Sequence, residues 1–412
     1  MAAWIALAVV MVVAAVVAQA PGLLLIAALT VGYGSVTGLW SRYGMRRVEY
    51  TRQLGTDRAV AGDVVDLDVT VWNRKPLPLP WVTADDLVGH GLTVRERPQM
   101  DVDYERNLAQ VLRNGWALAW YERVVRHFHL DDVRRGAYPF GPVQLRVRDI
   151  LGRRAVDLEL EMPDTLVVAP PSVEVRYAER AVAPLGERRA ASSLTADPAL
   201  FAGIRPFQPG DSLRQIHWRA TARLGATVSR RWEPARGRQV VVVIDAQTVD
   251  GPHWQMSFDE DAFEELCVVA ASLARRLLAD GASLGMAAAS FAGSPQKFAW
   301  LAPRASLGQL TRAGELLARI GPVASAPLPD LLAWLMRRVA PGTNMILLTA
   351  REPATVLPAL RRMQRTGYGV ELVLVGADAA ERAAAARRVG ISASSAELQP
   401  NWEHPRAVAV AG

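Results

Sequence analysis

Apolar and polar residues follow three different patterns along the chain. Residues 1–41 contain no charged side chain. Residues 48–170 hold short stretches in which apolar and polar residues alternate, whereas residues 239–376 alternate continuous apolar runs with amphipathic ones. A change of pattern predicts a change of domain, and 412 residues are enough for two or three domains.

The uncharged segment at the start predicts a pair of transmembrane helices. Pro21-Gly22 divides it into two halves, roughly 2–20 and 22–40. Each half has about the 20 residues that cross a hydrocarbon core, and proline with glycine favours a turn between them. We therefore expect a two-helix transmembrane hairpin over residues 1–41.

Three arginines after this segment suggest its orientation. Arg42, Arg46 and Arg47 follow the second half directly, and the positive-inside rule keeps that end in the cytoplasm. This predicts a multi-pass protein of the inner or plasma membrane with its soluble part in the cytoplasm. A signal peptide cleaved after Ala18-Gln19-Ala20 is the alternative, but the segment lacks a basic start and an equally apolar segment follows.

Residues 48–170 predict an all-β, sandwich-like domain. The stretch VVDLDVTVW at 64–72 alternates with period two, and NRKPLPLP at 73–80 is a turn-rich break. His127 and His129 are two residues apart, so on a strand they face the same side and could form half of a metal site. No carboxylate or third histidine stands at a convincing spacing, which favours a simple surface pair.

Residues 239–376 predict a doubly wound, mostly parallel α/β domain. QVVVVID at 239–245 and NMILLTA at 344–350 are typical of strands covered on both faces, and an amphipathic helix is expected at 258–281. Residues 377–412 are expected to form a C-terminal tail. No glycine-rich phosphate loop follows Asp245, the position where such sheets bind ligands.

Composition excludes several classes of protein. The net charge is +6, and Lys75 and Lys297 are the only lysines, so the basic character comes from arginine and gives no strong case for nucleic-acid binding. The single cysteine, Cys267, lies in an apolar helical run, which excludes a disulfide within the chain and predicts a buried core residue.

Residues 171–238 are expected to form a linker that contains a dense polar block, QPGDSLRQIHWRATAR at 208–223. Asp211 is placed to cap a helix running from about Ser212 to Arg223, which Gly225 would end. The spacing of Leu213, Ile216 and Ala220 predicts their shared inward face.

The block allows three interpretations. Catalysis would need a nucleophile, a base and an orienting group. Asp211 and His217 lie six residues apart, on different sides of a helix, and no partner would activate Ser212. Arg214 and Trp218, four residues apart, suit an anion or partner-docking site. Equally, these side chains could bind one another and fix the neighbouring segments, so docking and structural roles both stay open.

The block also carries a family resemblance. Its residues match the core pattern of the bacterial family called "domain of unknown function 58": Arg205, Phe207, Gly210, Asp211, Arg214, Ile216, Trp218, Thr221, Ala222 and Arg223. The segments RRGAYPFGPV, Asp149 with Gly152, and Gly62-Asp63 fit as well. The resemblance implies a transmembrane pair, a β region, the block and a von Willebrand factor A-like domain. Genes of this family often lie near those of MoxR-type AAA+ ATPases and transglutaminase-like membrane proteins, which makes these the expected partners.

The resemblance raises the question of a metal ion. Von Willebrand factor A domains bind Mg²⁺ through Asp-x-Ser-x-Ser after their first strand. Here Asp245 is retained, but Gln247 and Val249 replace the serines, and Arg351 follows the later strand. Valine offers no ligand oxygen and a nearby arginine repels a cation. The site is therefore predicted to be degenerate, without metal or cofactor.

These observations lead to the hypothesis of a membrane-anchored adaptor that works with a MoxR-type AAA+ ATPase in assembling or remodelling envelope proteins. No catalytic constellation supports an enzyme. A membrane-surface hydrolase that depends on His217, a purely structural envelope-associated protein and a nucleic-acid binder remain as alternatives.

Overall fold

The protein consists of two compact units, Met1–Ala169 and Pro170–Gly412. The computed structural model describes residues 2–17, 21–95, 101–103, 109–149, 155–173, 175–176, 196–207, 216–234, 239–252, 254, 257–292, 296–306, 308–398 and 408–411. Together the units form a mixed α/β protein with several sheets and a β-rich region near the amino terminus.

Two helices open the first unit, α1 (Ala2–Val17) and α2 (Pro21–Tyr43). The predicted transmembrane pair is wrong, because no helix among the described residues combines the length and the apolar character that a membrane crossing requires. In particular, α1 has only 16 residues, or about 24 Å, whereas a hydrocarbon core is about 30 Å thick. The same finding overturns the predicted location, which was that of a multi-pass membrane protein with a cytoplasmic soluble part.

The β-rich region of the first unit contains two sheets. Its strands are β1 (Val48–Leu54), β2 (Arg58–Val60), β3 (Val65–Asn73), β4 (Leu79–Val88), β5 (Thr93–Val94), β6 (Asp101–Asp103), β7 (Ala109–Leu118), β8 (Arg123–Asp131), β9 (Gly136–Arg148), β10 (Ala155–Leu160) and β11 (Asp164–Ala169). One sheet has the order β1-β3-β8-β5, and the other has β2-β11-β9-β4-β7-β6 with β10 paired to β9.

Buried and exposed side chains alternate along the strands of both sheets, so each sheet has one buried face, and the two faces share one core. Leu67 of β3, Phe128 of β8 and Leu145 of β9 belong to the same buried cluster. Within that core, Arg52 of β1 binds Asp86 of β4 through Nη1 and Oδ1 at 2.5 Å, and both side chains are fully buried. This ion pair joins one sheet to the other.

The second unit is built on an eight-stranded sheet. Its elements are β12 (Val175–Arg176), β13 (Ala196–Pro206), α3 (Trp218–Leu224), β14 (Val228–Pro234), β15 (Gln239–Ile244), α4 (Glu260–Ala279), β16 (Ser283–Ala288), β17 (Ala299–Arg304), α5 (Gln309–Arg319), α6 (Leu328–Met336), β18 (Asn344–Thr349), α7 (Pro353–Arg365), β19 (Gly369–Val375), α8 (Ala379–Arg388), β20 (Ser392–Leu398) and β21 (Val408–Ala411). The order in the sheet is β12-β21-β20-β19-β18-β15-β16-β17.

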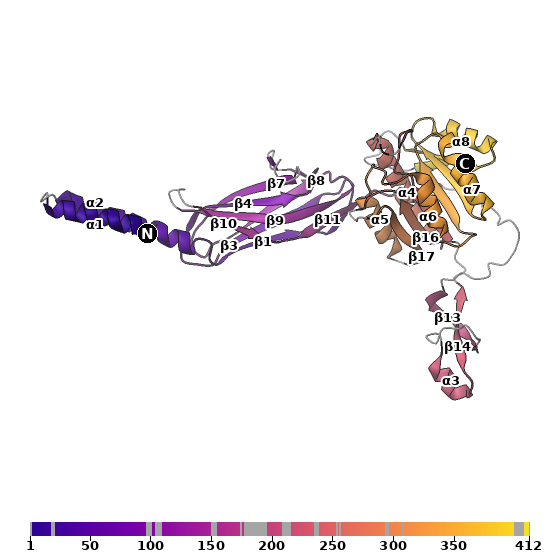
Figure 1. Ribbon diagram of the computed structural model, residues 1–412, viewed down its shortest axis with the longest axis horizontal. Helices are drawn as coiled ribbons and strands as arrows, with labels where there is room; N and C mark the ends of the chain where they lie inside the picture. Colours follow the sequence, from indigo (N-terminus) through magenta and orange to yellow (C-terminus); the bar gives the residue numbers. More distant parts are fainter. Residues whose placement is uncertain are drawn as a thin grey trace. The chain divides into compact units, whose positions relative to one another are not determined.

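Helices cover both faces of this sheet (Figure 1). Val240 and Val242 of β15 pack in the core beneath α4 and α5, whereas Val241 and Val243 pack in the core beneath α6, α7 and α8. Strands β16, β15, β18, β19 and β20 run parallel. The α/β pattern continues past residue 376, where a tail was predicted, because α8, β20 and β21 extend the same sheet and its cover.

Between β12 and β15, strands β13 and β14 pair in an antiparallel hairpin that carries α3 between them. Ile216 forms an isolated bridge with Ser229 of β14 and is 4% exposed. The residues that precede α3 in the polar block, 208–215, lie outside the described residues.

Candidate functional site at the carboxyl ends of the parallel strands

The candidate site lies at the carboxyl ends of β15 and β18. Asp245 follows β15, and its N–H donates to the carbonyl of Leu348 on the adjacent strand at 2.9 Å. The parallel pairing of these strands places Asp245 next to Thr349 and the loop that begins with Ala350. Open α/β sheets bind their ligands at this edge.

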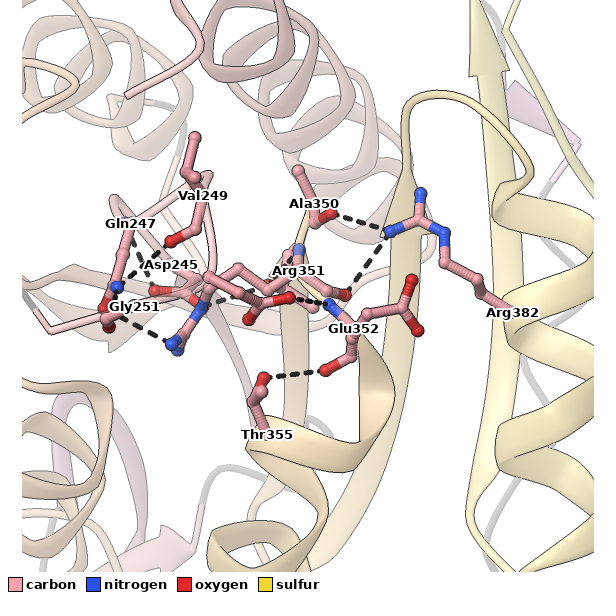
Figure 2. Close-up of polar contacts among 11 residues, drawn as sticks. Asp245, Gln247, Val249, Gly251, Ala350, Arg351, Glu352, Thr355 and Arg382 are labelled. Carbon is pink, nitrogen blue, oxygen red and sulfur yellow. Dashed lines mark hydrogen bonds and ion pairs between the residues drawn. The ribbon is translucent and has the colours of Figure 1, made fainter. Parts of the chain in front are cut away.

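Asp245 is buried and fully engaged by protein groups (Figure 2). Thr349 Oγ1 donates to its Oδ2 at 2.9 Å, and Arg351 Nε donates to the same oxygen at 2.8 Å. Arg351 Nη2 also lies 2.8 Å from that oxygen. The backbone N–H of Gln247 donates to Oδ1 at 3.3 Å.

Gln247 connects the same loop to Arg351. Its Oε1 accepts from Arg351 Nη1 at 3.2 Å, and its Nε2 donates to the carbonyls of Val249 and Gly251 at 3.1 and 2.6 Å. Val249 contributes only this backbone oxygen, since its side chain is 39% exposed and apolar. Of the three positions compared with the Mg²⁺ motif, Asp245 and Gln247 therefore bind the guanidinium of Arg351.

The electrostatics of the site follow from burial and from this ion pair. Burial raises the pKa of the Asp245 carboxyl, while the charge and hydrogen bonds of Arg351 and the hydroxyl of Thr349 act against that increase. The Arg351 side chain is 10% exposed and the Asp245 side chain 4% exposed. A second cation would have to displace a guanidinium that the surrounding protein already holds, at the cost of desolvation.

A further arginine, which the sequence did not single out, fixes the neighbouring loops. Arg382 of α8 donates to the carbonyls of Ala350, Val375 and Ala377 at 2.7, 2.8 and 2.8 Å. It thereby joins the loop after β18 to the loop after β19, and Figure 2 shows its bond to Ala350. Nothing in the sequence distinguishes Arg382 from the other arginines of its helix.

A cavity of about 560 Å³ lies beside these loops. Its polar lining includes Thr248, Asp259, Glu352, Glu381 and Arg382. The described residues hold no group of three or more His, Cys, Asp or Glu side chains suited to one metal ion. The hydroxyl of Thr349 donates to the same Asp245 oxygen that Arg351 binds.

The residues of the polar block are dispersed or lie outside the described part. Arg205 belongs to β13, and Gly210, Asp211 and Arg214 fall on undescribed positions. Ile216 is buried, as predicted, whereas Trp218 is 67% exposed and begins α3. Arg223 lies exposed in the last turn of this helix.

The helix of the block is shorter than predicted, and His217 caps it. It begins at Trp218 instead of Ser212, because His217 Nδ1 accepts from the N–H of Ala220 at 3.1 Å. Gly225 ends the helix in the left-handed conformation, as predicted. His217 thus caps the amino end of α3.

Fold and site together define a protein with a β-rich unit and a doubly wound α/β unit, in which an internal ion pair lies at the carboxyl ends of β15 and β18. Residues 203–303 match the family described as "Protein of unknown function DUF58". The chain is 26% identical over 258 residues to "Uncharacterized protein YeaD" of Bacillus subtilis (strain 168), covering 61% of this chain and 58% of that protein.

Two similar solved structures each cover 30% of the chain. The CARDB domain of the PF1109 protein from Pyrococcus furiosus is 15% identical and has a TM-score of 0.19, covering 30% of this chain and 96% of that one. The C-terminal domain of wzt is 10% identical with a TM-score of 0.20, covering 30% of this chain and 73% of that one.

Proposed function

We propose that this chain is an interaction protein without catalytic activity, and that its α/β unit is a von Willebrand factor A-like domain that works without a metal ion. The observation that carries the proposal is the buried ion pair between Asp245 and Arg351, with Oδ2 and Nε at 2.8 Å. The guanidinium binds the carboxylate that would otherwise bind Mg²⁺. The order of the strands, with antiparallel β17 at one edge, also supports this domain type.

The partner we propose is a MoxR-type AAA+ ATPase, an expectation that comes from the family resemblance. A transglutaminase-like protein is the other expected partner. The contact element we propose is α3, because Trp218 is 67% exposed and Leu224 is 57% exposed on a helix that buries none of its residues. Exposed tryptophan is enriched among the residues that dominate binding energy at protein interfaces.

Co-purification of the full chain with the MoxR-type ATPase of the same genome tests this proposal. We expect ATP-dependent association with the unaltered chain and a loss of at least about tenfold in affinity with Trp218→Ala. The matched control is Trp120→Ala, which removes a tryptophan that is 68% exposed on the other unit. Failure of the unaltered chain to associate in any nucleotide state would disprove the ATPase partnership.

The metal-free character is tested separately by calorimetric titration with Mg²⁺ and Mn²⁺. The ion pair predicts no saturable binding to the unaltered chain. Saturable binding that disappears in Asp245→Ala would contradict the proposal.

A further inference from the structure

Two histidines of the β-rich unit lie opposite two aspartates on one outward face. In the antiparallel pairing of β3 with β8, Asp68 stands directly across from His127 and Asp66 directly across from His129. The residues between them, Leu67 and Phe128, are buried in the core. Because side chains alternate along a strand, all four polar side chains are directed away from that core.

Each histidine is held through the same ring nitrogen. His127 Nδ1 lies 2.6 Å from Asp68 Oδ1, and His129 Nδ1 lies 2.7 Å from Asp66 Oδ1. A carboxylate accepts a hydrogen bond, so the neutral ring in this arrangement carries its proton on Nδ1. The lone pair of Nε2 is then available on both rings, which are 66% and 41% exposed for His127 and His129.

This arrangement is the one that metal-binding histidines adopt. A histidine that binds a metal through one nitrogen usually donates the other N–H to a carboxylate, which fixes the ring and raises its basicity. Outward positions two residues apart on a strand are separated by about 7 Å. Neighbouring imidazole rings can span that separation by leaning toward one ion, with metal–nitrogen distances of about 2.0–2.1 Å.

We propose that His127 and His129 form a binding site for a late first-row divalent cation such as Zn²⁺. The two Nε2 atoms are the ligands, and Asp66 and Asp68 are positioning residues that orient the rings. Imidazole nitrogen selects Zn²⁺, Cu²⁺ and Ni²⁺ over Mg²⁺ and Ca²⁺, which prefer oxygen ligands.

The site provides two protein ligands, and water completes the coordination. The described residues contain no group of three or more His, Cys, Asp or Glu side chains placed around one ion. Asp131, two residues beyond His129, is bound by Arg95 with Nε and Oδ2 at 2.6 Å. Coordination positions left to water give an open site, at which a further ligand can bind the ion. The site belongs to the β-rich unit and is independent of the proposed function of Asp245.

Calorimetric titration of the full chain with ZnCl₂ tests this inference. We expect saturable binding of one Zn²⁺ per chain, which is abolished in His127→Ala/His129→Ala. Asp66→Asn/Asp68→Asn keeps both ligand nitrogens and should weaken binding by about 10–100-fold, as the loss of an orienting carboxylate usually does. The matched control is His90→Ala, which removes an exposed histidine of the same unit and should bind Zn²⁺ unchanged.

Paramagnetic resonance of the Cu²⁺-loaded chain identifies the ligands directly. Coupling to two imidazole nitrogens is expected, and the His127→Ala/His129→Ala variant should lose it. All four side chains are exposed, and thermal unfolding followed by circular dichroism verifies that each variant is folded. Absence of saturable Zn²⁺ binding to the unaltered chain, or unchanged binding to the double variant, would overturn the inference.

Discussion

Lys75 is a charged residue held almost out of solvent. It is 5% exposed, and its Nζ donates to the carbonyl of Gly44 at 2.9 Å, just after α2 ends. Burial lowers the pKa of its ammonium group from 10.5 to about 8. Keeping this charge away from water therefore lowers the stability of the first unit at neutral pH.

The lowered pKa predicts a pH dependence with a definite sign. Above about pH 8 the folded state loses this proton while the unfolded state still holds it, so the free energy of unfolding rises with pH up to about 10.5. The full difference corresponds to an upper limit of about 3 kcal/mol. Urea unfolding from about pH 7.5 to about pH 9.5 should show this rise in the unaltered chain and a flatter profile in Lys75→Met.

Lys297→Met is the control for this experiment, because Lys297 is exposed. Its profile should follow that of the unaltered chain. If Lys75→Met and the unaltered chain gave parallel profiles, the charge of Lys75 would not be destabilising.

For single residues, the sequence predicted the position along a strand but not the side chain that each residue binds. The positions of Asp245, Gln247 and Arg351 at strand ends were predictable, because continuous apolar runs precede Asp245 and Thr349. That Arg351 binds Asp245 was not, since the two are 106 residues apart and only the packing of β15 beside β18 joins them. The carboxylates beside His127 and His129 were missed for the same reason, because the register of β3 against β8 is not visible in the sequence.

The short helix α3 is capped at its amino end by His217. It has seven residues and no buried side chain, so neither length nor packing stabilises it. The bond from the Ala220 N–H to His217 Nδ1 satisfies one of its free donors. His217→Ala should therefore destabilise α3 locally by about 1 kcal/mol, seen as roughly fivefold faster hydrogen exchange of its amides.

Arg219→Ala is the matched control, since Arg219 is exposed in the same helix and makes no capping bond. Exchange in α3 should stay unchanged in that variant. Equal exchange rates in His217→Ala and the unaltered chain would show that the cap contributes nothing to α3.

Helices and strands were predictable where a long periodic pattern of apolar residues defines them. The helix expected at 258–281 extends over Glu260–Ala279, because Asp259 caps it and its apolar stripe is continuous. The predicted start of the helix at Ser212 was wrong, because the prediction relied on a capping sequence at Asp211. In the structure His217 still belongs to the hairpin pairing, where its N–H donates to the carbonyl of Val228 at 2.9 Å. Apolar content alone also misled the interpretation of residues 1–41, where no helix in the described part meets the requirements for a membrane span.

At the scale of the whole molecule, each unit has its own hydrophobic core and its own buried ion pair. Arg52 with Asp86 lies in the core of the β-rich unit, and Asp245 with Arg351 lies at the edge of the α/β sheet. Removing one partner of a buried pair leaves a charge without compensation, which costs about 3–5 kcal/mol. Asp86→Asn and Arg351→Met should therefore each destabilise one unit and leave the other unchanged.

Native-state hydrogen exchange measures the protection of backbone amides in each unit separately. Arg351→Met should speed exchange in β15 and β18 and leave β3 and β4 at the rates of the unaltered chain, while Asp86→Asn should do the reverse. Each variant is thus the control for the other. If either variant lowered protection in both units together, the two cores would unfold as one cooperative body, because domains with independent cores unfold separately.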